Sequence, residues 1–361
     1  MERVLPEDII LNIFSRVPFE SLFECRLVSK TWNYFISNLN SPSSSSSSSD
    51  SKVSFISLNM LQSPKFQLLY LEYDETNNNN EQQLRISEIN HPPFSRVPYW
   101  LSMISGGNAP YQKIKSVIIG SSNGLICLSI PRDGYFGDFD DPLYIFNPVT
   151  REYISLPICG GNCLNGRNVF GFGYNSKTNE YKVVRIYYES KGHTEAGQVQ
   201  VYTLGAGSGW RNKGEIACSL QTNNSYSPGM NVDGEQIQVL GGCLCYVLKA
   251  RYDTINIWSF KKNNDTSKEE EDSSNWSSVG TVQIQHDNLA QFFYFTKSGN
   301  ILYWDDKKTA LSYDPRTSSI KELLNDGTTG LEVFETISYR SSFVSLKALG
   351  EENVKMFDRI N

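Results

Sequence analysis

The sequence lacks the long apolar segments that mark a membrane or secreted protein. Among its 361 residues, no run approaches the roughly 18 apolar residues of a membrane-spanning helix. Near the N-terminus, Pro6, Glu7 and Asp8 interrupt the apolar run that a signal peptide needs. The seven cysteines are scattered and odd in number, which is typical of reduced, buried thiols and not of a disulfide framework. We therefore expect a protein of the cytoplasm, the nucleus or both.

Basic residues are outnumbered by acidic ones. The chain has 33 Lys and Arg against 39 Asp and Glu, which gives a net charge of −6. Proteins that bind nucleic acid or anionic membranes normally carry a basic surface, so the sequence predicts neither partner. Two acidic stretches, 133–141 and 269–272, would suit a basic partner, but we interpret them as solvated loops.

Motifs for metals and cofactors are incomplete. Cys159 and Cys163 flank a Gly-rich stretch, but no second pair of ligands follows at the spacing of a zinc site. The run Gly171-Phe172-Gly173 lacks the third glycine and the helix of a dinucleotide fingerprint. Cys243 and Cys245 fall on one side of a predicted strand, where we expect buried apolar side chains. The sequence therefore predicts no metal and no cofactor.

One serine matches a catalytic pattern. Gly120-Ser121-Ser122-Asn123-Gly124 fits G-x-S-x-G, the nucleophile elbow of hydrolases, which requires a strand before the serine and a helix after it. Residues 125–129 predict a second strand, so we interpret Asn123-Gly124 as a hairpin turn. The sequence has three histidines, none with an evident catalytic partner: His91, His193 and His286. We assign no catalytic residue, and a hydrolase using Ser122 remains a remote alternative.

The chain divides at a serine-rich segment. Residues 4–39 predict helices, and the serine run after them cannot bury enough apolar surface to offset its ordering entropy. The pattern then changes to short strands separated by turns. The expected organisation is a helical domain at 1–40, a linker at 41–52, a β domain at 53–350 and a C-terminal tail at 351–361.

The helical domain carries an apolar stripe. Pro6 suits the first turn of a helix, and Glu7 and Asp8 suit its positive end. Apolar residues with helical spacing follow: Ile9, Ile10, Ile13, Phe14 and Val17. Two more helical runs follow near 22–28 and 32–36. Three helices this short bury little surface by themselves, so the stripe either packs on the rest of the chain or continues into a partner protein.

The order of residues in this segment resembles an F-box. Leu5-Pro6-Glu7-Asp8 is followed by Ile13-Phe14-Ser15-Arg16-Val17-Pro18, and the segment closes with Val28-Ser29-Lys30-Thr31-Trp32. F-boxes dock on the Skp-type adaptor of Skp–cullin–F-box ubiquitin ligases. The resemblance implies that eight residues lie in or behind the adaptor interface: Leu5, Pro6, Ile9, Ile13, Phe14, Leu22, Val28 and Trp32.

The β domain repeats short phrases. Phe146-Asn147-Pro148-Val149-Thr150 and Tyr313-Asp314-Pro315-Arg316-Thr317 each read as a β-turn followed by an alternating strand. Glycine turns also precede three dense apolar strands, at 125–128, 243–247 and 301–304. The repeated units are 115–157, 168–211, 236–282 and 291–324. Such repeats predict a β-propeller of about six blades, with one or two blades from 53–90 and 331–350. A β-sandwich is the structural alternative.

This arrangement resembles the kelch-like F-box-associated domain of plant F-box proteins, in the superfamily of the S-locus F-box proteins. Three phrases carry the resemblance: Gly124-Leu125-Ile126-Cys127, Asn147-Pro148-Val149-Thr150, and Phe170-Gly171-Phe172-Gly173-Tyr174 followed by Tyr181-Lys182-Val183-Val184. The expected fold class is therefore α+β multidomain, with a small three-helix F-box before an all-β, kelch-like propeller.

The resemblance implies a receptor and not an enzyme. It predicts a substrate-recognition subunit that binds a Skp-type adaptor, and through it a cullin scaffold, and that recruits a target protein for ubiquitination and proteasomal degradation. The alternative is a protein-binding propeller that works outside ubiquitination. The sequence assigns no substrate-binding residues.

Overall fold

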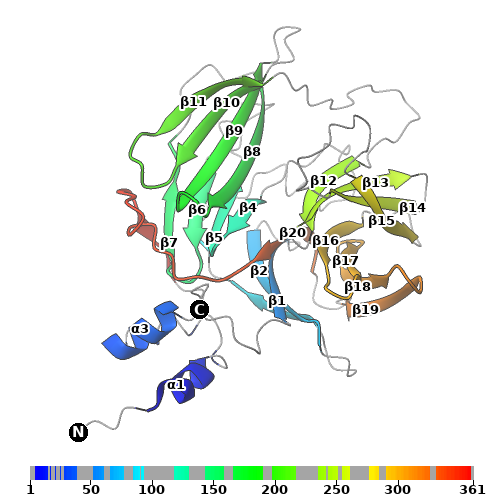
Figure 1. The fold of residues 1–361 in the computed structure, drawn as a ribbon, viewed down its shortest axis with the longest axis horizontal. Coiled ribbons are helices and arrows are strands. Elements are labelled where there is room, and N and C mark those ends of the chain that lie inside the picture. The colour runs from blue at the N-terminus through cyan, green and yellow to red at the C-terminus, as the bar shows by residue number, and fades with distance from the viewer. Residues whose placement is uncertain are drawn as a thin grey trace, which may run out of the picture.

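The computed structural model shows a mostly β chain whose described residues include two helices near the N-terminus (Figure 1). It describes residues 5–14, 17, 21, 25, 28–38, 52–60, 66–76, 84–89, 91–92, 118–129, 143–157, 166–189, 197–216, 235–240, 243–250, 254–260, 276–283, 290–325 and 331–358. Within these residues, neither helix reaches the length and apolar character of a membrane span. The expected α+β composition is confirmed.

The helices are α1 (Glu7–Phe14) and α3 (Lys30–Asn38). The backbone N–H groups of Ile9 and Ile10 donate to the Pro6 carbonyl at 3.2 and 3.1 Å, which starts α1 where the sequence predicts. The Ser29 hydroxyl accepts a hydrogen bond from the Trp32 N–H at 3.1 Å and caps α3. The predicted middle helix falls largely outside the described residues, so the count of three helices is unconfirmed.

The described strands form five antiparallel sheets. Sheet 1 contains β20 (Val333–Tyr339), β1 (Lys52–Met60), β2 (Phe66–Asp74) and β3 (Leu84–Glu88). Sheet 2 contains β4 (Ile118–Ser122), β5 (Leu125–Ser129), β6 (Leu143–Asn147), β7 (Glu152–Ser155) and β21 (Lys355–Met356).

The other three sheets have four strands each, in sequence order. Sheet 3 contains β8 (Gly166–Asn175), β9 (Glu180–Glu189), β10 (Gly197–Thr203) and β11 (Trp210–Ile216). Sheet 4 contains β12 (Glu235–Leu240), β13 (Cys243–Ala250), β14 (Thr254–Phe260) and β15 (Trp276–Gln283). Sheet 5 contains β16 (Gln291–Phe295), β17 (Ile301–Asp305), β18 (Thr309–Asp314) and β19 (Ser319–Asn325).

Neighbouring sheets meet along one edge strand each. The contacts join β8 to β4, β4 to β20, β20 to β16 and β16 to β12, so the spatial order is sheet 3, 2, 1, 5 and 4. Among the described strands this series does not close into a ring, and Figure 1 shows sheet 3 standing apart from sheet 4. The predicted propeller is therefore not confirmed.

The two ends of the β domain share one sheet. Strand β1 pairs with β20, with Ile56 opposite Ile337 and Ser57 opposite Thr336. The buried hydroxyls of Ser57 and Thr336 are 2.6 Å apart and hydrogen-bonded. Residues 53–90 and 331–350 thus contribute to a single sheet, so the structure describes five sheets where the repeats predict about six blades.

The two turns that begin at Asn147 and Asp314 have the same geometry. The Asn147 Oδ1 atom accepts from the Val149 N–H at 2.9 Å, and the Asp314 Oδ1 atom accepts from the Arg316 N–H at 2.9 Å. Each turn ends on a residue with positive φ, 59° at Arg151 and 54° at Ser318. The predicted β-turns are confirmed, because an Asn or Asp side chain closes the loop over the following backbone.

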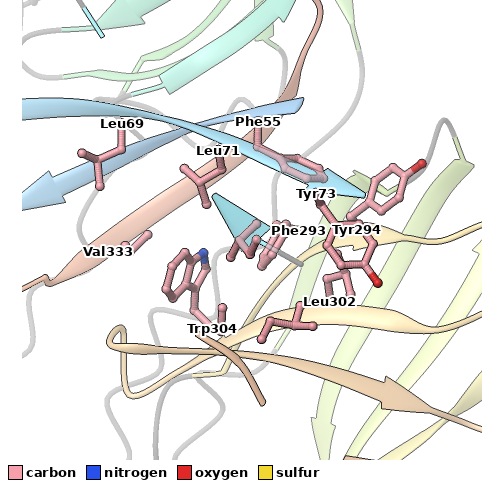
Figure 2. Packing of buried hydrophobic residues seen from close by; sticks show 12 residues of the cluster. Phe55, Leu69, Leu71, Tyr73, Phe293, Tyr294, Leu302, Trp304 and Val333 are labelled. Carbon is pink, nitrogen blue, oxygen red and sulfur yellow. The ribbon is translucent and has the colours of Figure 1, made fainter. Parts of the chain in front are cut away.

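The cores lie between adjacent sheets. Between sheets 1 and 5, the Phe55 ring meets Phe293 edge-on at 5.1 Å, and Trp304 is fully buried in the same cluster (Figure 2). The Trp304 indole N–H donates to the Thr336 hydroxyl at 3.0 Å, so its one polar atom is satisfied. Similar clusters fill the spaces between sheets 1 and 2, 2 and 3, and 4 and 5.

The chain beyond β20 returns across sheets 2 and 3. Residues 342–351, here called the C-terminal strap, run beside the turns of these sheets before β21 pairs with β7. Lys355 lies opposite Tyr153, and the Phe357 N–H donates to the Arg151 carbonyl at 3.1 Å. The described part of the predicted tail therefore pairs with the β domain.

Two glycines of one loop allow a matched test of this packing. Gly205 (φ 73°) lies against the strap, where an added Cβ would overlap the Leu349 carbonyl, whereas Gly207 (φ 63°) has nothing within 4 Å of that position. We expect Gly207→Ala to cost about 1 kcal/mol through backbone strain. Gly205→Ala should cost about 1–3 kcal/mol more, through overpacking. Denaturant unfolding measures both, and equal losses would show that the strap is not packed on Gly205.

Candidate functional site

Helix α1 has one buried and one exposed apolar side. Ile10 and Phe14, one turn apart, are 3% and 1% exposed. Ile9 and Ile13, also one turn apart, are 43% and 42% exposed. Residues four apart lie on the same side of a helix, so Ile9 and Ile13 form an apolar row facing solvent. Leu5, just before the helix, is also exposed.

The buried side of α1 packs on α3. Ile10, Phe14 and Ile36 form a small core, with Trp32, Phe35 and Cys25 around it. The Phe14 and Trp32 rings meet nearly at right angles, with their centres 5.0 Å apart. Phe14 and half-buried Trp32 therefore support the exposed row from behind and hold α1 in place.

The eight residues implied by the F-box resemblance divide by exposure. Five are exposed: Leu5, Pro6, Ile9, Ile13 and Val28. Phe14 is buried and Trp32 is half-buried, while Leu22 lies outside the described residues. Tyr34 on α3 is a further exposed aromatic residue, and it falls after the closing Trp32 of the motif.

The exposed row is suited to binding a protein. Burying an Ile or Leu side chain stabilises a complex by roughly 1.5–3 kcal/mol, and grouped exposed apolar side chains mark interaction sites. The side chains of Leu5, Ile9 and Ile13 carry no polar or titratable atom. The arrangement can therefore dock an apolar partner surface, while it offers no group for acid–base or nucleophilic chemistry.

The serine of the G-x-S-x-G match lies in a hairpin. Ser122 ends β4 and Leu125 begins β5, with Asn123 (φ 43°) and Gly124 (φ 83°) between them. Two consecutive positive φ values are typical of the tight turn of a β-hairpin, so the predicted turn is confirmed. A nucleophile elbow needs a helix at this point, and β5 occupies it.

The other reactive side chains do not form a site among the described residues. Cys127 and Cys245 are buried, and burial raises the pKa of the Cys127 thiol. A His91 ring nitrogen lies 2.8 Å from the Pro92 carbonyl oxygen. No three His, Cys, Asp or Glu side chains gather as metal ligands in the described part of the chain. The remaining candidates lie outside the described residues: Cys159, Cys163, His193 and His286.

Two models of known protein families match separate parts of the chain. Residues 4–44 match the family model described as F-box domain, which covers all of the exposed row. Residues 76–237 match the family model described as F-box associated beta propeller domain. The second match includes β4 to β11 and the phrases around Gly124, Asn147 and Phe170.

Several curated proteins of Arabidopsis thaliana are similar over most of the chain. F-box protein At3g07870 is 25% identical over 90% of this chain and 88% of its own length. F-box protein CPR1 is 26% identical over 85% of this chain and 79% of its own length. A solved structure, a putative 6-phosphogluconolactonase from Bacteroides fragilis, has 9% identity over 77% of this chain and 95% of its own, with a TM-score of 0.34. A similarity that low assigns neither fold nor function.

Proposed function

Because this chain is a plant F-box protein with an F-box-associated domain, we propose that it is the substrate-recognition subunit of a Skp–cullin–F-box ubiquitin ligase. The F-box binds a Skp-type adaptor and, through it, a cullin scaffold. The β domain binds a target protein for ubiquitination and proteasomal degradation. The observation that carries the proposal is the exposed row of Ile9 and Ile13 on a helix whose other side is buried.

The proposed adaptor interface uses the F-box residues in two ways. Leu5, Pro6, Ile9, Ile13 and Val28 contact the adaptor directly, which their exposure supports. Phe14 and Trp32 pack α1 against α3 behind these exposed residues. Leu22 is included on the F-box motif alone.

The proposed mechanism is proximity and not bond-making by this chain. Binding a target and the adaptor on one polypeptide raises the local concentration of the target near the ubiquitin-charged enzyme. Orientation of the reacting groups then contributes to the rate without a catalytic residue in the receptor. Such a receptor works in the cytoplasm, the nucleus or both, where the rest of the ligase operates.

The β domain is proposed to be a kelch-like propeller that displays target-binding loops. Two observations support this: sheets 2 to 5 each contain four consecutive strands, and the sheets meet through their edge strands β4, β8, β12, β16 and β20. The proposed boundaries are 1–40 for the F-box, 41–52 for the linker, 53–350 for the propeller and 351–361 for the tail.

Affinity capture of the intact chain from plant cells with the proteasome blocked tests this function. We expect the adaptor, the cullin and at least one ubiquitinated target to co-purify. With Ile9→Asp and Ile13→Asp together, the target should still be captured but should lose its ubiquitin. A target captured equally, with unchanged ubiquitination by both forms, would favour a protein-binding role outside the ligase.

A further inference from the structure

The C-terminal strap is attached to sheet 2 by Asn147. The Asn147 Nδ2 atom donates to the carbonyl oxygens of Ser342 at 2.9 Å and Val344 at 2.8 Å. The Ser342 hydroxyl in turn donates to the Asn123 carbonyl, in the hairpin between β4 and β5. A single buried amide therefore fixes the backbone on both sides of residue 343.

Two carboxylates attach the rest of the strap. Glu152 accepts hydrogen bonds from the Ser345 hydroxyl at 2.9 Å and from the Leu346 N–H. Glu351 accepts from the Gly205 N–H at 2.8 Å and from the Tyr202 hydroxyl at 3.2 Å. Burial, reinforced by the Glu351 charge, raises the pKa of Tyr202 to about 12. The Tyr202 hydroxyl thus stays protonated and able to donate at physiological pH.

Adjacent strap residues pack on different domains. Val344 packs against the cluster between sheets 2 and 3, which also contains the fully buried Leu346. Phe343 packs instead against the F-box core of Ile10, Phe14 and Ile36. The strap therefore presents Phe343 to the F-box while its neighbours hold the β domain.

We propose that Phe343 is a positioning residue that fixes the orientation of the F-box on the β domain. This inference rests on the proposed ligase function, in which the distance between target and adaptor matters. The serine-rich sequence 41–52 predicts a flexible linker, and such a linker alone would let the two domains rotate. The strap supplies a second connection, far away in the sequence, that restricts this rotation.

Pulsed electron–electron double resonance, which measures the distance between two spin labels, tests the proposal on the full-length protein. Spin-labelled unnatural amino acids would replace exposed Thr31 on α3 and exposed Lys177 in the turn between β8 and β9. We expect one narrow distance distribution for the otherwise unaltered chain. Phe343→Ala should broaden that distribution at least about twofold, because the linker then sets the range of motion. Phe343→Leu should largely restore the narrow distribution, because it keeps an apolar side chain in the F-box core.

Adaptor affinity separates this proposal from the function on which it rests. A broadened distribution with adaptor binding retained supports the positioning role, and exposed Met356→Ala is the matched control that should change neither measurement. An unchanged distribution in folded Phe343→Ala would overturn the positioning role while leaving adaptor binding intact. Failure of the unaltered chain to bind the adaptor would instead contradict the proposed function.

A second variant leaves the F-box core untouched, in case Phe343→Ala unfolds it. Asn147→Asp keeps the Oδ1 atom that accepts from the Val149 N–H, but it removes the Nδ2 donor that holds the Ser342 and Val344 carbonyls on both sides of Phe343. We expect this variant to broaden the distance distribution, while Gly207→Ala, with open space at its Cβ, should not. A narrow distribution in folded Asn147→Asp would also overturn the proposal.

Discussion

Replacing Ile9 and Ile13 together by aspartate is expected to weaken binding of the Skp-type adaptor at least about a hundredfold. Ile9 and Ile13 keep 43% and 42% of their surface exposed in the free chain. Fully burying an isoleucine is worth roughly 1.5–3 kcal/mol, so covering the exposed part of both contributes about 1.2–2.6 kcal/mol. Burying two unpaired carboxylates in their place costs at least about another 2 kcal/mol, and each 1.4 kcal/mol corresponds to about a tenfold change in affinity. Isothermal titration calorimetry of the full-length variant with purified adaptor measures the loss.

The control for this experiment is a substitution of the same kind on the β domain. Ile320 on β19 is exposed to a similar degree, 39%, and lies outside the F-box. Ile320→Asp should therefore bind the adaptor as the unaltered chain does. Circular dichroism confirms that each variant is folded. Adaptor affinity within about threefold of the unaltered chain, less than 1 kcal/mol, for folded Ile9→Asp, Ile13→Asp would contradict the proposed interface.

Replacing Trp304 by alanine is expected to lower the free energy of unfolding of the β domain by about 3–5 kcal/mol. Trp304 is fully buried between sheets 1 and 5, facing side chains that come from both ends of the domain sequence (Figure 2). The substitution leaves a large cavity and removes the donor to the Thr336 hydroxyl. The substitution therefore weakens the packing between sheet 5 and sheet 1, the sheet in which β1 and β20 pair.

Chemical denaturation followed by tyrosine and tryptophan fluorescence measures this effect. Trp304→Phe keeps most of the apolar volume and should lose less than Trp304→Ala. Exposed Met356→Ala should fall within about 0.5 kcal/mol of the unaltered chain. A loss under about 1 kcal/mol for Trp304→Ala, well below the usual cost of deleting a buried tryptophan, would mean that sheets 1 and 5 do not pack as described.

Local sequence signals were sufficient for α1 and α3, the turns and the repeat units. Alternating buried and exposed pairs along α1 follow from helical spacing, and the Asn123-Gly124 hairpin follows from residues that accept positive φ. The predicted units 115–157 and 168–211 correspond to sheets 2 and 3, because each is a run of consecutive hairpins. Such features depend on residues close together in the chain.

Long-range pairing could not be predicted in the same way. Ser57 and Thr336 are hydrogen-bonded across 279 residues, and no local pattern identifies β20 as the partner of β1. The strap has no regular periodicity, so nothing in its sequence indicates that Phe343 packs on the F-box core. Leu22 was implied by the motif alone, and its side chain lies outside the described residues.

Adaptor binding by the unaltered full-length chain tests the proposed ligase role most directly. Purified protein and a purified plant Skp-type adaptor would be combined, and their complex would be measured by calorimetry and light scattering. We expect a one-to-one complex with a dissociation constant of about 1 μM or tighter, which corresponds to a binding free energy of roughly −8 kcal/mol. If the folded protein does not bind at tens of micromolar adaptor, a binding free energy of about −6 kcal/mol or weaker, the proposed role is wrong.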